Sequence, residues 1–176
     1  TAAEQAPKTT RVAAITRSWA KQDRTLPHAL ALLAEAARQR ADVAVLPQEC
    51  VPTDGGPQAA AALAALADAA RTHRLFLAVP LRERDGDHEF LTSYLLGSDG
   101  KLLGRYRKSH RMPDEPFALG DELPVFDTPL GKVGLMIGTD HYWPEIPLVL
   151  ALKGAELVLH SGGVEPVPQS FPMDVK

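Results

Sequence analysis

The chain has 176 residues, of which 45% are hydrophobic and 23% are charged, and its formal net charge at pH 7 is −3. These values are typical of a folded globular protein, and the length favours one domain with a substantial core. The basic residues are dispersed and no apolar run approaches the ~20 residues of a membrane-spanning helix, so the composition predicts neither a nucleic-acid partner nor a membrane partner.

The cysteine content leaves the compartment open. Cys50 is the only cysteine, which excludes an intrachain disulfide. We expect a cytoplasmic protein, with export after removal of a signal as the alternative. Residues 1–9 contain no export signal themselves, and we expect them to form a disordered leader.

The first half of the chain alternates expected strands and helices. Residues 12–15 and 43–46 are short apolar runs that predict buried strands. Between them, apolar residues recur at helical spacing over 26–37, with Thr25 as the N-cap and Pro27 in the first turn.

A second helix is expected after the loop signal at 54–57. It is rich in alanine, and its apolar face contains Leu63, Leu66, Ala67 and Ala70. Residues 75–79 form another apolar run, which predicts a third strand.

Turn residues predict two hairpins in the second half of the chain. Ser98-Asp99-Gly100 separates strands expected at 90–96 and 102–106. In the same way, the turn at 128–131 separates strands expected at 125–126 and 133–137.

The last expected elements are a helix at 146–152, ended by Gly154, and a strand at 157–159. Strands and helices that alternate early, followed by hairpins, predict an α/β layered domain with a mixed sheet. We place this domain at 10–161, before an irregular proline-rich tail at 162–176.

Three segments carry a resemblance to a known family. They read Val43-Ala44-Val45-Leu46-Pro47-Gln48-Glu49, Gly104-Arg105-Tyr106-Arg107-Lys108-Ser109-His110 and Gly131-Lys132-Val133-Gly134-Leu135-Met136-Ile137-Gly138-Thr139-Asp140-His141-Tyr142-Trp143-Pro144-Glu145. Their order and spacing resemble the nitrilase, or carbon–nitrogen hydrolase, superfamily. The resemblance implies an α-β-β-α sandwich with mixed sheets, here lacking the C-terminal part, and no cofactor.

The resemblance also implies a role for each matching residue. Glu49 corresponds to the general base and Lys108 to the lysine that stabilises the oxyanion. Glu115 is the best candidate for a second glutamate that orients the lysine or the base, although its segment is shorter than the family pattern. The backbone N–H of Thr139 corresponds to the second oxyanion donor. Gly138 occupies the position of the cysteine nucleophile and has no side chain.

The glycine changes the expected chemistry. A thiolate attacks an amide or nitrile carbon once a base has removed its proton, and no covalent intermediate can form on a glycine. The hydroxyl of Thr139 and the thiol of Cys50 are conceivable substitutes. We favour a third hypothesis, a water molecule held by Glu49 and Lys108 in the vacated space.

Four residues after Thr139 complete the set of expected site residues. We expect Asp140 to brace the elbow, and His141, Tyr142 and Trp143 to contribute to binding, although packing against the following helix explains the two aromatic residues equally well. No pair of histidines has metal-ligand spacing, so we expect no metal.

Two functions remain open from the sequence. One is a divergent carbon–nitrogen hydrolase that acts on a non-peptide amide or nitrile bond. The other is a catalytically inactive member that binds a small amide-like molecule or a protein partner. Because family domains continue beyond the strand at 157–159, we expect the exposed sheet face to be buried by a homo-oligomeric partner or by a missing segment.

Overall fold

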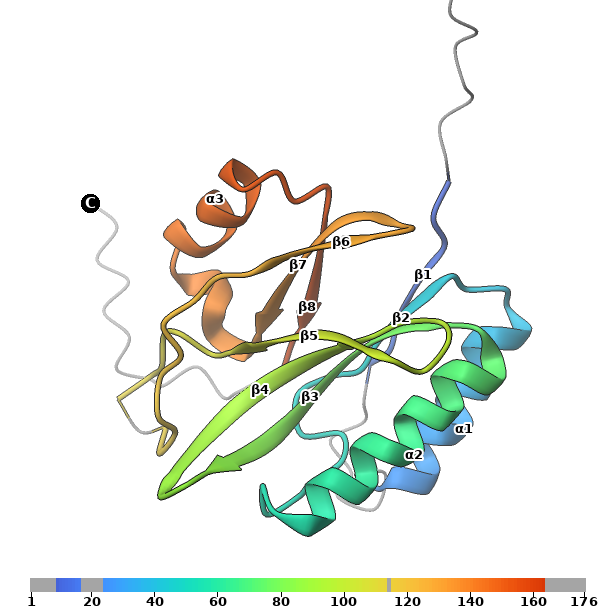
Figure 1. Ribbon diagram of the computed structural model, residues 1–176, viewed down its shortest axis with the longest axis horizontal. Helices are drawn as coiled ribbons and strands as arrows, with labels where there is room; N and C mark the ends of the chain where they lie inside the picture. The colour runs from blue at the N-terminus through green and yellow to red at the C-terminus, as the bar shows by residue number, and fades with distance from the viewer. Residues whose placement is uncertain (1–8, 17–23, 114, 164–176) are drawn as a thin grey trace, which may run out of the picture.

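The computed structural model describes residues 9–16, 24–113 and 115–163 (Figure 1). The elements, in chain order, are β1 (Val12–Ala14), α1 (Leu26–Arg38), β2 (Val43–Val45), α2 (Pro57–His73), β3 (Phe76–Asp85), β4 (His88–Leu96), β5 (Leu102–Arg107), β6 (Val125–Thr128), β7 (Gly131–Ile137), the 3₁₀ helix η2 (Gly138–Tyr142), α3 (Glu145–Leu152) and β8 (Leu157–Ser161). The expected leader and tail lie almost wholly outside the described residues, so their boundaries stay predictions.

The strands form two mixed sheets. The first has the order β1-β2-β3-β4-β5, in which β1, β2 and β3 are parallel and β3, β4 and β5 are antiparallel. The second has the order β6-β7-β8, with an antiparallel β6–β7 hairpin and parallel β7 and β8.

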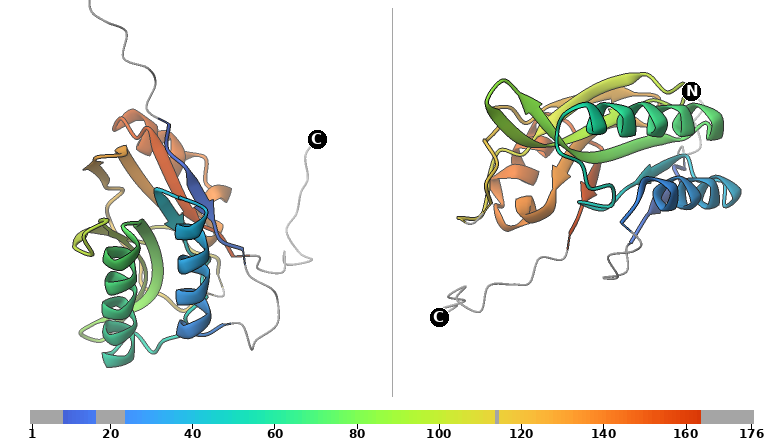
Figure 2. Two further views of the ribbon diagram at one scale, coloured as in Figure 1. Left: turned by 90° about the vertical axis from the view of Figure 1, so that its right-hand side faces the viewer. Right: turned by 90° about the horizontal axis from the view of Figure 1, so that it is seen from below.

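Four layers result from the way apolar side chains alternate along the strands. In β2, Ala44 faces the cluster that α1 and α2 complete, whereas Val43 and Val45 face the second sheet. The two helices lie side by side on the first sheet, and α3 covers the outer face of the second (Figure 2). This is the α-β-β-α arrangement with mixed sheets that the family resemblance implied.

The local signals explain the ends of several elements. Thr25 caps α1 by accepting a hydrogen bond from His28 N at 3.3 Å. After α3, Gly154 adopts a φ of +88°, the left-handed conformation expected of a residue just past a helix. Within the described ranges, no helix combines the length and apolar character needed to span a membrane.

One strand is longer than expected. The sequence predicted a strand at 75–79, but β3 continues to Asp85 and pairs with β4 across the turn at Gly86. The extension contains Arg82, Glu83 and Arg84, which weaken the apolar signal. Glu83 is nevertheless buried, because it pairs with Arg105 and Arg107 on β5.

Candidate active site

The site is built around the elbow that follows β7. The strand ends at Ile137, and η2 begins at Gly138 with a φ of +52°. This left-handed backbone favours glycine over any residue with a Cβ. The carboxylate of Asp140 braces the turn by accepting hydrogen bonds from Ile137 N at 2.8 Å and from the Tyr106 hydroxyl at 2.9 Å.

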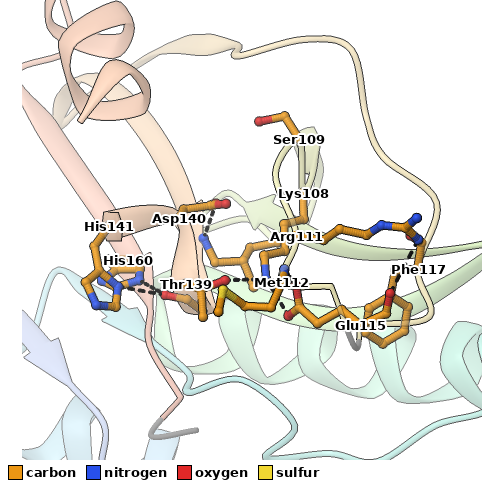
Figure 3. A network of polar contacts seen from close by, with 12 residues as sticks. Lys108, Ser109, Arg111, Met112, Glu115, Phe117, Thr139, Asp140, His141 and His160 are labelled. Atoms are coloured by element: carbon orange, nitrogen blue, oxygen red, sulfur yellow. Dashed lines mark hydrogen bonds and ion pairs between the residues drawn. The ribbon is translucent and has the colours of Figure 1, made fainter. Parts of the chain in front are cut away.

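Lys108 reaches the elbow from the end of β5. Its side chain is 1% exposed, and its Nζ donates to Thr139 Oγ1 at 2.8 Å and to both carboxylate oxygens of Glu115 (Figure 3). Glu115 is held in turn by Met112 N, which donates to Oε2 at 2.8 Å. The structure therefore brings together Lys108, Glu115, Thr139 and Gly138, four of the residues that the sequence singled out.

Glu49 lies differently from the expectation. Its carboxylate pairs with Arg24 and lies 3.7 Å from Arg82 Nη2, so its resolved partners are arginines and not Lys108. The sequence predicted a strand at 43–46 and placed Glu49 in the site by resemblance. In the structure β2 ends at Val45, and a turn closes from Cys50 N to Pro47 O at 3.2 Å. Glu49 has a φ of +56° within this turn, which redirects its side chain.

Gln48 takes the place beside the elbow that was expected for Glu49. A Cβ built on Gly138 would overlap Gln48 Oε1, and would lie 3.3 Å from Gln48 Cδ and 3.6 Å from Lys108 Nζ. Sequence reasoning missed this residue, because a glutamine at the end of a strand carries no signal of its own and the outcome depends on how the turn bends.

Two histidines hold the backbone of the elbow. The carbonyl oxygen of Gly138 lies 2.9 Å from His141 Nδ1 and 2.8 Å from His160 Nε2. Both nitrogens must carry a proton to donate to this oxygen. Burial lowers the pKa of His160, which favours the neutral ring. His141 thus contacts the backbone oxygen of Gly138, and its expected role in binding stays a prediction.

The two aromatic residues lie toward the surface and the following helix. Tyr142 is 43% exposed, and its ring lies against that of His141 in a tilted arrangement with centroids 4.2 Å apart. Trp143 packs against the cluster under α3 and against His110, at a centroid distance of 5.4 Å. These contacts match the packing alternative for Trp143, and a binding role for either residue stays a prediction.

The buried carboxyl of Asp140 predicts an unusual dependence of stability on pH. Burial raises its pKa from 3.8 to about 6. The folded state holds this proton more tightly than the unfolded state. The contribution of the protonated Asp140 carboxyl to the free energy of unfolding is therefore full below pH 4 and is lost as the pH rises to about 6. The loss is on the order of 3 kcal/mol.

Asp140→Asn removes this titration and keeps an oxygen for both hydrogen bonds. Relative to the wild type, we expect its free energy of unfolding to rise by up to ~3 kcal/mol between pH 4 and pH 7, measured by urea denaturation. Asp127→Asn, whose side chain is 87% exposed, controls for the loss of one carboxylate. If the free energy of unfolding of Asp140→Asn differs from that of the wild type by the same amount at pH 4 and at pH 7, the prediction is wrong.

Comparison with known proteins places these residues in a family context. The family model described as carbon-nitrogen hydrolase matches residues 2–174. The chain is 38% identical over 98 residues to a nitrilase from Pyrococcus abyssi, covering 54% of this chain and 37% of that protein. It is 32% identical over 117 residues to a citrullinase from Francisella tularensis, covering 61% and 40%. The match therefore spans less than half the length of these relatives.

A solved structure of similar fold is a double mutant of the amidase from Nesterenkonia sp. AN1 in complex with acrylamide. It aligns with a TM-score of 0.79 and 25% identity, covering 96% of this chain and 71% of that chain. Its two replacements are glutamate to glutamine and cysteine to alanine.

Proposed function

This chain belongs to the carbon–nitrogen hydrolase family, and from that premise we propose that it binds a small amide-type compound at the elbow without covalent catalysis. The observation that carries this proposal is the buried Lys108–Glu115–Thr139 network beside Gly138. It retains a polar anchor for a carbonyl oxygen at a position where no nucleophilic side chain is present.

The anchor suits a neutral polar ligand. An ammonium group has three N–H donors, and those of Lys108 contact two oxygens of Glu115 and one of Thr139. The lysine charge is therefore balanced by Glu115, and both side chains are buried. A ligand carbonyl can replace the Thr139 hydroxyl as the third acceptor, whereas a second carboxylate would leave a buried excess of negative charge.

The other groups near the elbow do not supply the missing chemistry. Glu49 is held by two arginines, and Gln48 has no basic carboxylate. The Thr139 hydroxyl contacts Lys108, which is an acid partner and not a base. A covalent mechanism needs a nucleophile next to a base that accepts its proton, and none of these residues forms that pair.

The amidase double mutant supports binding without the thiol, because that protein has a similar fold and is in complex with acrylamide although its cysteine is replaced by alanine. Transferred to this chain, the comparison favours a primary amide as the ligand class.

Hydrolysis by an activated water is the second candidate. It is favoured by the intact Lys108–Glu115 pair, because a buried cation beside the reacting carbon stabilises an oxyanion and can leave ~10³-fold catalysis over water after loss of the nucleophile.

The test measures binding and turnover on the same protein. Calorimetry with propionamide is expected to show saturable binding, and an ammonia assay is expected to show no release above buffer. The control is the double variant Lys108→Met with Glu115→Gln, which removes both charges together and is expected to lose binding. Ammonia release that is absent from this control would establish the hydrolase instead, and no binding to the wild-type chain would refute the proposal.

A further inference from the structure

Gln48 is packed between two glycines at the centre of the site. The residue is 5% exposed, and its backbone N–H donates to Gly162 O at 3.0 Å. A Cβ on Gly163 would lie 3.2 Å from Gln48 Cβ and 3.4 Å from its Oε1. The glutamine side chain thus lies close to both Gly163 and Gly138, and both neighbours lack a side chain.

The terminal amide of Gln48 lies where a side chain at position 138 would begin. A Cβ on Gly138 would overlap Gln48 Oε1. The Nζ of Lys108 lies 3.6 Å from this Cβ position. A carboxamide therefore already occupies the space next to the lysine. Gln48 and Gly138 are complementary in size, since the larger residue fits only because the smaller one is present.

We infer that Gln48 is a removable plug, by which we mean a side-chain carboxamide that fills the ligand position and must move before an external carboxamide can bind. The inference rests on the proposed function and adds the ligand's position and the residue that controls entry.

The plug also predicts the chemistry of the ligand. The space accommodates a planar group with one acceptor oxygen and one amide nitrogen, as in acetamide or propionamide. A carboxylate of the same shape would bring a second negative charge next to the buried Glu115. We therefore expect acetamide to bind and acetate to bind more weakly.

The first experiment is a double-mutant cycle that needs no ligand. Gly138→Ala introduces a Cβ and is combined with Gln48→Ala in the full chain. The strain of alanine at a φ of +52° affects both backgrounds equally and cancels in the cycle. Gly138→Ala is expected to lower the melting temperature by about 3 °C more when Gln48 is present than when it is absent. If Gly138→Ala lowers the melting temperature equally in the Gln48 background and in the Gln48→Ala background, the inference is overturned.

The second experiment measures acetamide binding by calorimetry, with acetate as the comparison. Gln48→Ala is expected to bind acetamide at least tenfold more tightly than the wild type. Gln48→Met keeps the bulk without the amide and is expected to show no such gain. Gln58→Ala, at an exposed position of α2, controls for the loss of a glutamine elsewhere.

The outcomes separate the plug from the proposed function. If the wild type binds acetamide and Gln48→Ala binds it no more tightly, the plug is wrong and the function stands. If neither the wild type nor Gln48→Ala binds acetamide or propionamide, the plug and the proposed function are both wrong. Tighter binding by Gln48→Ala, together with coupling in the cycle, supports the plug.

Discussion

Replacing Gly138 with cysteine and Gln48 with glutamate in the same protein is expected to raise amide hydrolysis at least ~10²-fold over either single variant. The reason is that a thiol needs a neighbouring base, and the two positions are in direct contact. In enzymes of this kind the nucleophile and its base act as a unit, so restoring one alone recovers little.

The single variants identify which glutamate can act as the base. With Gly138→Cys alone, Gln48 has no basic carboxylate to accept the thiol proton, so ammonia release from propionamide is expected to stay at background. If Glu49 is the base, as the sequence suggested, Gly138→Cys alone gives turnover, and adding Glu49→Gln abolishes it. That pattern would contradict our prediction and identify Glu49 as the general base.

Lys108→Met is expected to lower the free energy of unfolding by about 3–5 kcal/mol, because it leaves the buried carboxylate of Glu115 without its counter-ion. Methionine preserves most of the volume of lysine, so the loss reports the charge and not a cavity. Urea denaturation at pH 7 measures the change.

Removing both charges together is expected to recover most of that stability. In the double variant Lys108→Met with Glu115→Gln, the glutamine can still accept the hydrogen bond from Met112 N, and no isolated buried charge remains. Lys101→Met is the matched surface control, since its ion pair with Asp99 has a lysine side chain 82% exposed and is worth at most about 1 kcal/mol. A loss in Lys108→Met no larger than in Lys101→Met would show that the buried pair contributes little.

The sequence by itself determined the order and type of the elements. Apolar periodicity distinguished α1 and α2 from the strands β1, β2 and β3 around them, and Ser98-Asp99-Gly100 marked the β4–β5 hairpin. These signals are local, because side-chain alternation and turn conformation depend on residues close together in the chain. The motif around Gly138 likewise specifies the elbow through residues adjacent in the chain.

Only the tertiary structure decided which side chains meet at the elbow. The pairing of Lys108 with Glu115 depends on the path of the loop after β5, and the extension of β3 depends on ion pairs with β5. Gln48, and not Glu49, faces Gly138 because the chain turns at 47–50 and Glu49, inside that turn, has a left-handed backbone. A change of one residue in where a strand ends redirects the side chains after it, and the sequence contains no signal strong enough to determine that endpoint.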